Sequence, residues 1–203
     1  MRRCAPLAFG LSLLAVLLPT GAAAQNLVVN PDFDADLSGW TGNGVWSSLD
    51  LVGSPSSGSA AWNNLNAGTS GGLYITQCIE ISGVFEGYYF GSWAYIPSGQ
   101  AGTGVAGLSL TFYSDAGCTD YLEGYGGSQT ADLDAWRHLS LEGWVPTGAG
   151  SATIGMLNQK YGVGDFQTHH DSIHFGRHTI MIFGDGFESA DVSDWTSAIG
   201  SAW

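Results

Sequence analysis

The sequence predicts an all-β protein built as an antiparallel β-sandwich, and three observations support this. Several short stretches alternate apolar and polar residues with the period of two that is typical of half-buried strands. Turn residues separate these stretches, and glycine alone contributes 31 of the 203 residues. No stretch after residue 25 keeps a 3.6-residue apolar period for three turns, so helices are not expected. The predicted strands are 73–81, 88–96, 107–114, 137–145, 152–157 and 171–175.

The first 24 residues are expected to be a secretory signal that is removed before folding. Arg2 and Arg3 precede an apolar run at 7–18, which is too short to span a bilayer, and three alanines at 22–24 supply a cleavage site. No later segment is long and apolar enough to insert into a membrane. We therefore expect a secreted or cell-surface protein in three parts: the signal at 1–24, a β-sandwich domain at 25–177 and a C-terminal appendage at 178–203.

The chain is strongly acidic, with 18 Asp and Glu residues against five Lys and Arg residues. Loss of Arg2 and Arg3 with the signal lowers the formal net charge from −13 to −15. Nucleic acids and anionic membrane surfaces both require basic patches, so neither is expected as a partner. A neutral partner or a cation fits this charge, although solubility alone is a sufficient explanation for it.

Two cysteines remain after processing, Cys78 and Cys118, and an even number in an exported chain favours one disulfide. In the chain-entropy model, closing a loop of this size stabilises a fold by at most roughly 4 kcal/mol.

Strand parity separates a core face from a second, aromatic face in the middle of the chain. In 88–96 the residues Tyr89, Trp93 and Tyr95 share the side opposite the expected core, and Tyr113 takes the corresponding side of 107–114. Exposed aromatic clusters usually bind something, although a loop or a neighbouring strand could instead cover these rings. The expected core set is Tyr88, Phe90, Ser92, Ala94, Ile96, Leu108, Leu110 and Phe112.

A series of segments resembles, in order, the strands of carbohydrate-binding modules of the family 4/9/22 type, which have a galactose-binding-like jelly roll. The opening QNLVVNPDFDADLSGWT carries the Asn-Leu, Asn-x-x-Phe and Gly-Trp pattern of their first strand, and YYFGSWAYIPSG is similar to their Tyr- and Trp-containing strand. The other matching segments are 53–62, 75–81, 134–156 and 169–176.

The resemblance implies a non-catalytic module that binds a polysaccharide or other glycan on a concave sheet or at a loop edge. Sugar rings present C–H faces that pack on aromatic side chains. Trp93, Tyr95 and Tyr113 are the expected carbohydrate-binding platform, with Trp136 and Trp144 as further candidates. The alternative is a structural or protein-interaction sandwich of the cell surface that binds no sugar.

The same resemblance implies a structural Ca²⁺ that ties the first strand to the last. The matching positions are Asp34 and Asp171, since calcium prefers hard oxygen ligands. A solvated acidic turn is the alternative for these carboxylates.

No catalytic residue is expected. The G-x-S-x-G match at 68–72 precedes a predicted strand where a nucleophile elbow needs a helix, and the G-x-G-x-x-G match at 102–107 also precedes a strand. His170, His174 and His178 have zinc spacing only on a helix, whereas on a strand His170 and His174 would share one polar face. Two carboxyl groups facing one cleft would instead support the hypothesis of a glycan-active enzyme.

The segment FDADLSGWT at 33–41 recurs near the C-terminus as FESADVSDWT at 187–196, with one extra residue. The second copy resembles short C-terminal segments of exported bacterial proteins. It is polar and acidic, with Phe187 and Trp195 as its large anchors, which is the composition of an appendage. It is either part of another module or a tail recognised by a cell-surface partner during export or sorting.

Overall fold

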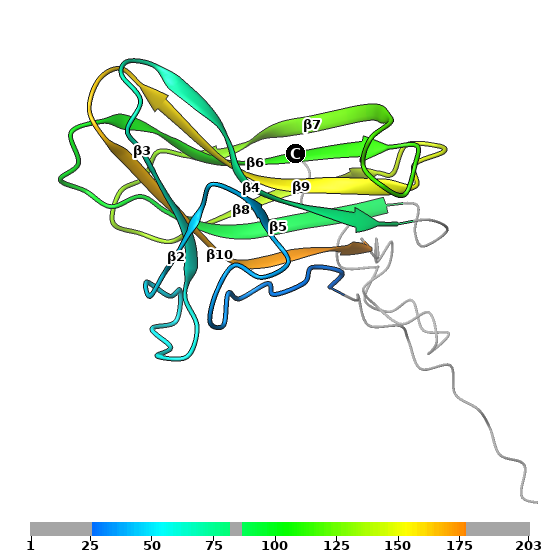
Figure 1. Cartoon of the computed structure of the whole chain (residues 1–203), viewed down its shortest axis with the longest axis horizontal. Coiled ribbons are helices and arrows are strands. Elements are labelled where there is room, and N and C mark those ends of the chain that lie inside the picture. The colour runs from blue at the N-terminus through cyan, green and yellow to red at the C-terminus, as the bar shows by residue number, and fades with distance from the viewer. Residues whose placement is uncertain (1–25, 82–86, 178–203) are drawn as a thin grey trace, which may run out of the picture.

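The computed structural model describes residues 26–81 and 87–177, which form two five-stranded sheets packed face to face (Figure 1). Sheet A has the order β1 (Thr41–Gly42), β4 (Ser70–Glu80), β9 (Ser151–Tyr161), β6 (Thr103–Tyr113) and β7 (Tyr121–Thr130). Sheet B has the order β2 (Val45–Ser47), β3 (Ser59–Asn64), β10 (Phe166–Arg177), β5 (Gly87–Tyr95) and β8 (Arg137–Trp144). All pairs of neighbouring strands are antiparallel, so the predicted β-sandwich is confirmed.

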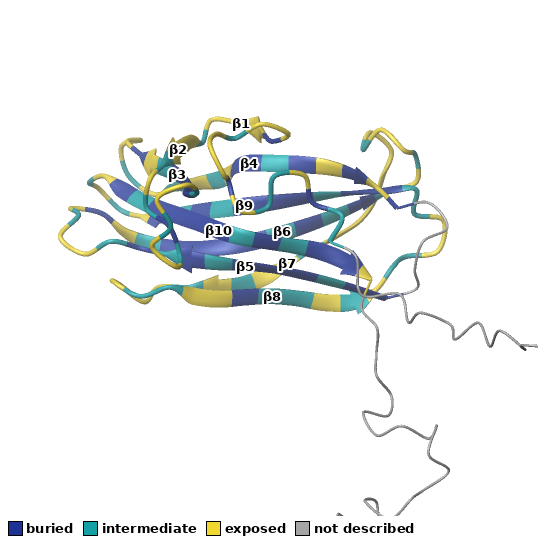
Figure 2. Ribbon diagram, turned by 90° about the horizontal axis from the view of Figure 1, so that it is seen from below, coloured by how far each residue is buried: buried dark blue, intermediate teal, exposed yellow. Residues whose placement is uncertain are grey.

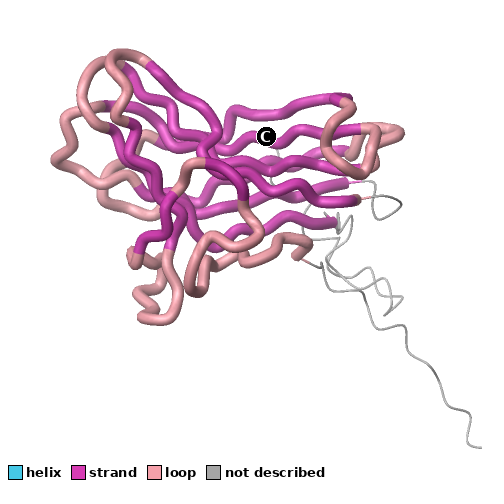
Figure 3. The backbone as a smooth tube through the Cα atoms, viewed as in Figure 1, coloured by secondary structure: helices cyan, strands magenta, loops and turns pink. Residues whose placement is uncertain are grey.

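The described part of the chain consists of strands and loops without a helix (Figure 3). None of its segments is therefore a helix long and apolar enough to cross a membrane. The chain passes between the two sheets repeatedly, since β3, β5 and β8 of sheet B alternate with β4, β6 and β9 of sheet A. Such alternation is typical of jelly-roll sandwiches.

The core lies between the sheets, as the buried stretches of β5, β6, β9 and β10 show in Figure 2. Strand parity assigned the inward faces of β5 and β6 correctly, because every member of the expected core set is buried. Tyr88 and Phe112 pack ring against ring across the interior, with centroids 5.3 Å apart. The opposite face of β5 is only partly exposed, which is where the aromatic residues of interest lie.

The segment before β1 closes the sandwich at the side of β10. The Leu27 amide donates to the carbonyl of Phe175 at 2.8 Å, and the Ile173 amide donates to the carbonyl of Pro31 at 2.9 Å. Phe33 and Trp40 are both buried in the core, with ring centroids 5.6 Å apart. The first copy of the repeated motif is therefore an integral part of the sandwich, whereas the second copy lies outside the described residues, as does the expected signal at 1–24.

The predicted disulfide between Cys78 and Cys118 is present and links β4 to the turn after β6. One expectation for β10 is wrong. A β-bulge between Asp171 and His174 shifts the strand register, so His170 points into the core while His174 lies on the outer face. The two histidines therefore do not share a face, and His178 lies outside the described residues.

Candidate functional site

The outer face of sheet B carries two neighbouring groups of rings that together we call the aromatic face. Its central strand is β5, whose outward residues lie between those of β8 on one side and β10 on the other. The members are Tyr89, Trp93, Tyr95, Trp136, His138, His169 and His174.

Contacts between these rings form one group around Tyr89 and Trp93 and a second group at the end of β5. Near its start, Tyr89 lies between His138 and His174, with ring centroids 6.3 Å and 5.6 Å away. In the middle, Trp93 packs edge to face against His138, and their ring centroids are 5.2 Å apart. At the end of the strand, the ring centroid of Tyr95 lies 5.4 Å from that of Trp136 and 6.1 Å from that of His169.

The Tyr95 end of the face is fixed by the loop between β7 and β8. The side chain of Asp134 accepts a hydrogen bond from the Ser98 amide at 2.8 Å and one from the Tyr95 hydroxyl at 3.4 Å. The Asp134 amide donates to the carbonyl of Ile96, so the loop is held against the chain that follows β5. Trp136 belongs to this loop, which explains its position beside Tyr95.

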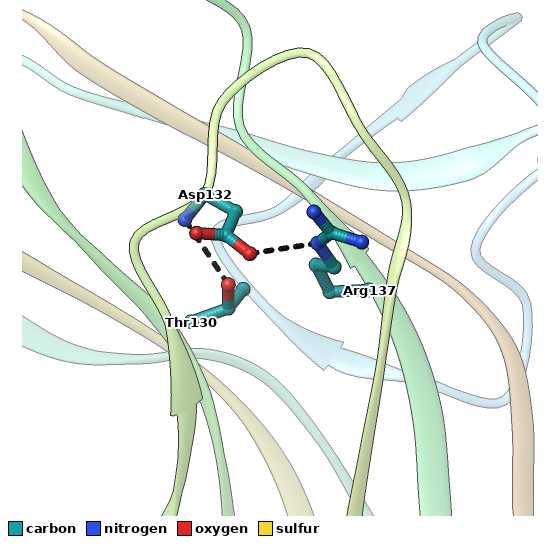
Figure 4. Close-up of polar contacts among 3 residues, drawn as sticks. All are labelled: Thr130, Asp132 and Arg137. Carbon is teal, nitrogen blue, oxygen red and sulfur yellow. Dashed lines mark hydrogen bonds and ion pairs between the residues drawn. The ribbon is translucent and has the colours of Figure 1, made fainter.

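An exposed ion pair braces the base of the same loop (Figure 4). The Arg137 Nε atom lies 2.7 Å from an oxygen of Asp132, whose own amide donates to the Thr130 hydroxyl at 3.1 Å. Both ends of the loop are thereby tied together. The Arg137 guanidinium, at the start of β8, is therefore paired with a carboxylate.

The tyrosine hydroxyls of the face stay protonated and can donate hydrogen bonds. Burial, followed by the negative charge of Glu142, raises the pKa of Tyr89, so its phenol stays protonated at neutral pH. Burial and then Asp134 likewise raise the pKa of Tyr95. The Tyr89 hydroxyl lies 2.9 Å from the His138 Nε2 atom, within hydrogen-bond distance.

The structure brings together two of the three residues expected to form the platform. Trp93 and Tyr95 are neighbours on the aromatic face, and each is partly exposed. Tyr113 is also partly exposed, but it lies on the outer side of sheet A, so it does not share a surface with the other two. Parity could show that each residue points away from the core, but not that their strands belong to different sheets.

Of the two further candidates, Trp136 joins the aromatic face and Trp144 stands at the other end of β8 with 64% of its surface exposed. Sequence reasoning placed Tyr89 on this side of its strand without choosing it, and it did not choose the three histidines. Their selection depends on the registers that pair His138 with Trp93 and His169 with Tyr95. No local pattern in the sequence encodes such pairing.

The two carboxylates implied as calcium ligands lie in different surroundings. Asp171 is 2% exposed and accepts hydrogen bonds from the amides of Leu51 and Ser172, whereas Asp34 is exposed. Burial, followed by the negative charges of Asp50 and Asp32, raises the pKa of Asp171 to about 6.

Within residues 26–81 and 87–177, no group of three or more His, Cys, Asp or Glu side chains is placed to hold a metal ion. A calcium ion beside Asp171 would therefore need backbone carbonyls for most of its ligands. The chemistry of a buried carboxylate among acidic neighbours fits a cation, although its two oxygens already accept backbone hydrogen bonds.

The two motif matches at 68–72 and 102–107 lie in strands or in the residues just before them. Ser70 begins β4 and donates a hydrogen bond to the side chain of Asn64 at 3.2 Å. Gly102 precedes β6 and donates from its amide to the carbonyl of Asp165. A hollow of about 340 Å³ lies elsewhere, between the first segment and β4, and none of the aromatic face residues lines it.

No family model matches the sequence, and no curated protein matches it by sequence. Comparison with solved structures does find similar folds. The enzymatically active domain of tailspike protein 4 of bacteriophage CBA120 superposes with a TM-score of 0.57 at 18% identity, over 74% of this chain and 21% of the tailspike chain.

Two further similar structures contain modules of carbohydrate-binding family 22. The xylan-binding domain of that family matches with a TM-score of 0.53 at 15% identity, over 74% of this chain and 94% of the domain. The Clostridium thermocellum endo-1,4-β-D-xylanase 10B, in a structure of its family 22 and catalytic modules with xylohexaose, matches with a TM-score of 0.51 at 14% identity, over 76% of this chain.

This chain spans only 21% of the tailspike chain and 29% of the xylanase chain, but nearly the whole of the isolated xylan-binding domain. At these identities the likeness concerns the fold. The described residues therefore have the β-sandwich fold seen in carbohydrate-binding modules.

Proposed function

We propose that this protein is an exported, non-catalytic module that binds a neutral poly- or oligosaccharide on the aromatic face of sheet B. The observation that carries the proposal is the alignment of two groups of contacting rings along β5, one around Tyr89 and Trp93 and one around Tyr95. Sugar rings pack their C–H surfaces on aromatic rings, and their hydroxyl groups need polar partners close by. The imidazoles of the face and the side chains of Asp134 and Glu142 can supply those partners.

The acidic character of the chain supports a neutral ligand. The formal net charge is −13, and the Arg137 side chain near the face is paired with Asp132. A uronate-bearing or sulfated polysaccharide would therefore meet repulsion without a compensating cation. The sandwich fold is shared with xylan-binding modules and agrees with a polysaccharide ligand. An extended polysaccharide chain can lie on the outer face of a sheet.

Export belongs to the same proposal, on the basis of residues 1–24. A cell-surface partner for the tail at 187–196 is proposed from its sequence alone.

A structural calcium ion at Asp171, with Asp34 as the second implied ligand, is the proposed cofactor. Its support is a buried carboxylate beside Asp50 and Asp32 that, among the described residues, has no cationic side chain next to it. A bound calcium ion would offset the negative charge where the first segment meets β10.

The test is binding of the processed protein to a panel of neutral and uronate-bearing polysaccharides, measured by affinity electrophoresis and then by calorimetry on soluble fragments. We expect binding to at least one neutral polysaccharide and a loss of at least about tenfold in Trp93→Ala, since a central aromatic anchor contributes at least about 1.4 kcal/mol. Tyr113→Ala is the matched control, because it removes a partly exposed ring from the other sheet.

Two results would contradict the proposal. Folded wild-type protein that binds no polysaccharide would favour the structural or protein-interaction alternative. Binding that Tyr113→Ala loses and Trp93→Ala retains would keep the sugar and move its site to sheet A.

A further inference from the structure

The side chain of Tyr89 does not project straight out from the sheet. Its ring lies over Gly91, the next outward position of β5. A β-carbon added to Gly91 would fall 2.6 Å from the Tyr89 hydroxyl oxygen and 2.9 Å from its Cε1 atom. His174 pairs with Gly91 across the sheet and approaches Tyr89 to 5.6 Å. Gly91 is accordingly buried although it belongs to the outer face.

Glycine at this position provides space, not an unusual backbone. Gly91 is not among the glycines with positive φ, so its backbone is open to other residues. The atoms that a new side chain would meet belong to the far end of Tyr89, which can rotate away. A small side chain at 91 should therefore move the ring and leave the fold intact.

This arrangement changes the spacing of the rings along the strand. Successive outward positions on a strand are about 7 Å apart, so side chains at 89 and 93 that stood upright would be separated by about 13 Å. By lying over Gly91, Tyr89 fills this gap. Rings then occupy the three successive outward positions 91, 93 and 95, with Trp93 and Tyr95 as the second and third.

We propose that Gly91 is a positioning residue that lets Tyr89 complete a row of three rings, and that the ligand is an extended sugar chain that lies along β5. The inference rests on the proposed function and adds the direction of the ligand and the number of stacking positions. His138 contacts both Tyr89 and Trp93, so it sits beside the junction of the first two positions.

The experiment compares Gly91→Ala, Tyr89→Ala and Tyr89→Phe with wild type on a ladder of two- to six-sugar fragments of the polysaccharide that wild type binds. Wild-type affinity should rise with length until the chain covers all three rings. Gly91→Ala and Tyr89→Ala should lose about tenfold on the longer fragments and little on the shortest, because one stacking position is removed. Tyr89→Phe keeps the ring and should keep most of the affinity.

Gly72→Ala is the matched control, since Gly72 is a strand residue of sheet A whose added β-carbon would meet nothing within 4 Å. The imidazole signals of His138 and His174 in NMR spectra report the ring position independently of any ligand. They should shift in Gly91→Ala while the melting temperature stays close to that of wild type.

Wild-type protein that binds, together with Gly91→Ala that binds equally well or loses the same factor at every length, would overturn the inference and leave the proposed function standing. Unmoved imidazole signals in Gly91→Ala would also overturn it. Wild-type protein that binds no sugar would overturn the proposed function itself and the inference with it.

Discussion

Two adjacent histidines of β10 face opposite sides of sheet B. His170 is fully buried in the core with its Nδ1 atom 3.0 Å from the Ser92 hydroxyl, and its Nε2 atom has no hydrogen-bond partner among the described residues. His169 is buried on the outer side, 3.1 Å from the Ser59 hydroxyl. Burial lowers the pKa of His169 to about 4, and burial together with His169 lowers the pKa of His170 to about 3.

These shifts predict a loss of stability in mild acid. The unfolded chain takes up protons on both histidines near pH 6.5, while the folded protein does not, so stability falls as the pH drops from 6.5 towards 4. Between the folded and unfolded pKa values, each histidine lowers the free energy of unfolding by about 1.4 kcal/mol per pH unit of acidification. Asp171 acts in the opposite direction, since its raised pKa means that falling pH between 6 and 3.8 adds stability. The two histidines outweigh it.

His170→Gln should therefore flatten the pH dependence, and Asp171→Asn should steepen it. The measurement is urea unfolding between pH 7.5 and 4.5 in a chelating buffer, which keeps metal ions out of the comparison. An unchanged slope in His170→Gln would contradict this explanation.

At the scale of a single element, the bulge in β10 decides what its outer face presents. Before the bulge His169 points outward, and after it His174 does so, although the two are five positions apart, an odd number. An uninterrupted strand would have put the two on opposite faces. The bulge thus places two imidazoles on the aromatic face, one beside Tyr95 and one beside Tyr89.

The disulfide joins elements on the other side of the molecule. It ties β4 to the turn after β6, both within sheet A, so it should matter for stability and not for the ligand. We expect the double variant Cys78→Ser, Cys118→Ser to lose up to about 4 kcal/mol in urea unfolding, as the unfolded chain regains the freedom of a long loop. Its affinity for the polysaccharide should equal that of wild type, and a marked drop would implicate sheet A in binding.

At the scale of the whole molecule, the first segment and the last strand close the sandwich together. Gln77 of β4 exchanges hydrogen bonds with both backbone groups of Val29, while Leu27 and Pro31 bond to β10. The segment therefore contacts both sheets. Any group that stabilises its junction with β10 should stabilise the whole fold.

The calcium proposal is tested at this junction. Calcium should raise the melting temperature of wild-type protein relative to a chelator, by linkage, and Asp171→Asn should abolish the rise. Asp34→Asn tests the other implied ligand and should reduce the rise. Identical melting curves with calcium and with chelator would contradict the proposal, and magnesium controls for ionic strength.

Much of the fold could be predicted from the sequence because its signals are local. Alternation gave the strands and their inward faces, so Phe90 and Leu110 were placed in the core correctly. The cysteine count gave the disulfide. Where prediction failed, the deciding feature was not local: Tyr113 depends on which sheet contains β6, and His170 depends on a one-residue bulge.

The sequence by itself determined the all-β class, the two faces of each central strand and the acidic charge that disfavours anionic partners, because these follow from period, turn residues and composition. Only the tertiary structure decided which outward rings meet. Strand order separated Tyr113 from Trp93, and register placed His138 and His174 around Tyr89. Because Gly91 has no side chain, the Tyr89 ring can lie over it. Contacts between strands depend on pairing across long stretches of chain, and the pattern within one strand carries no record of its neighbours.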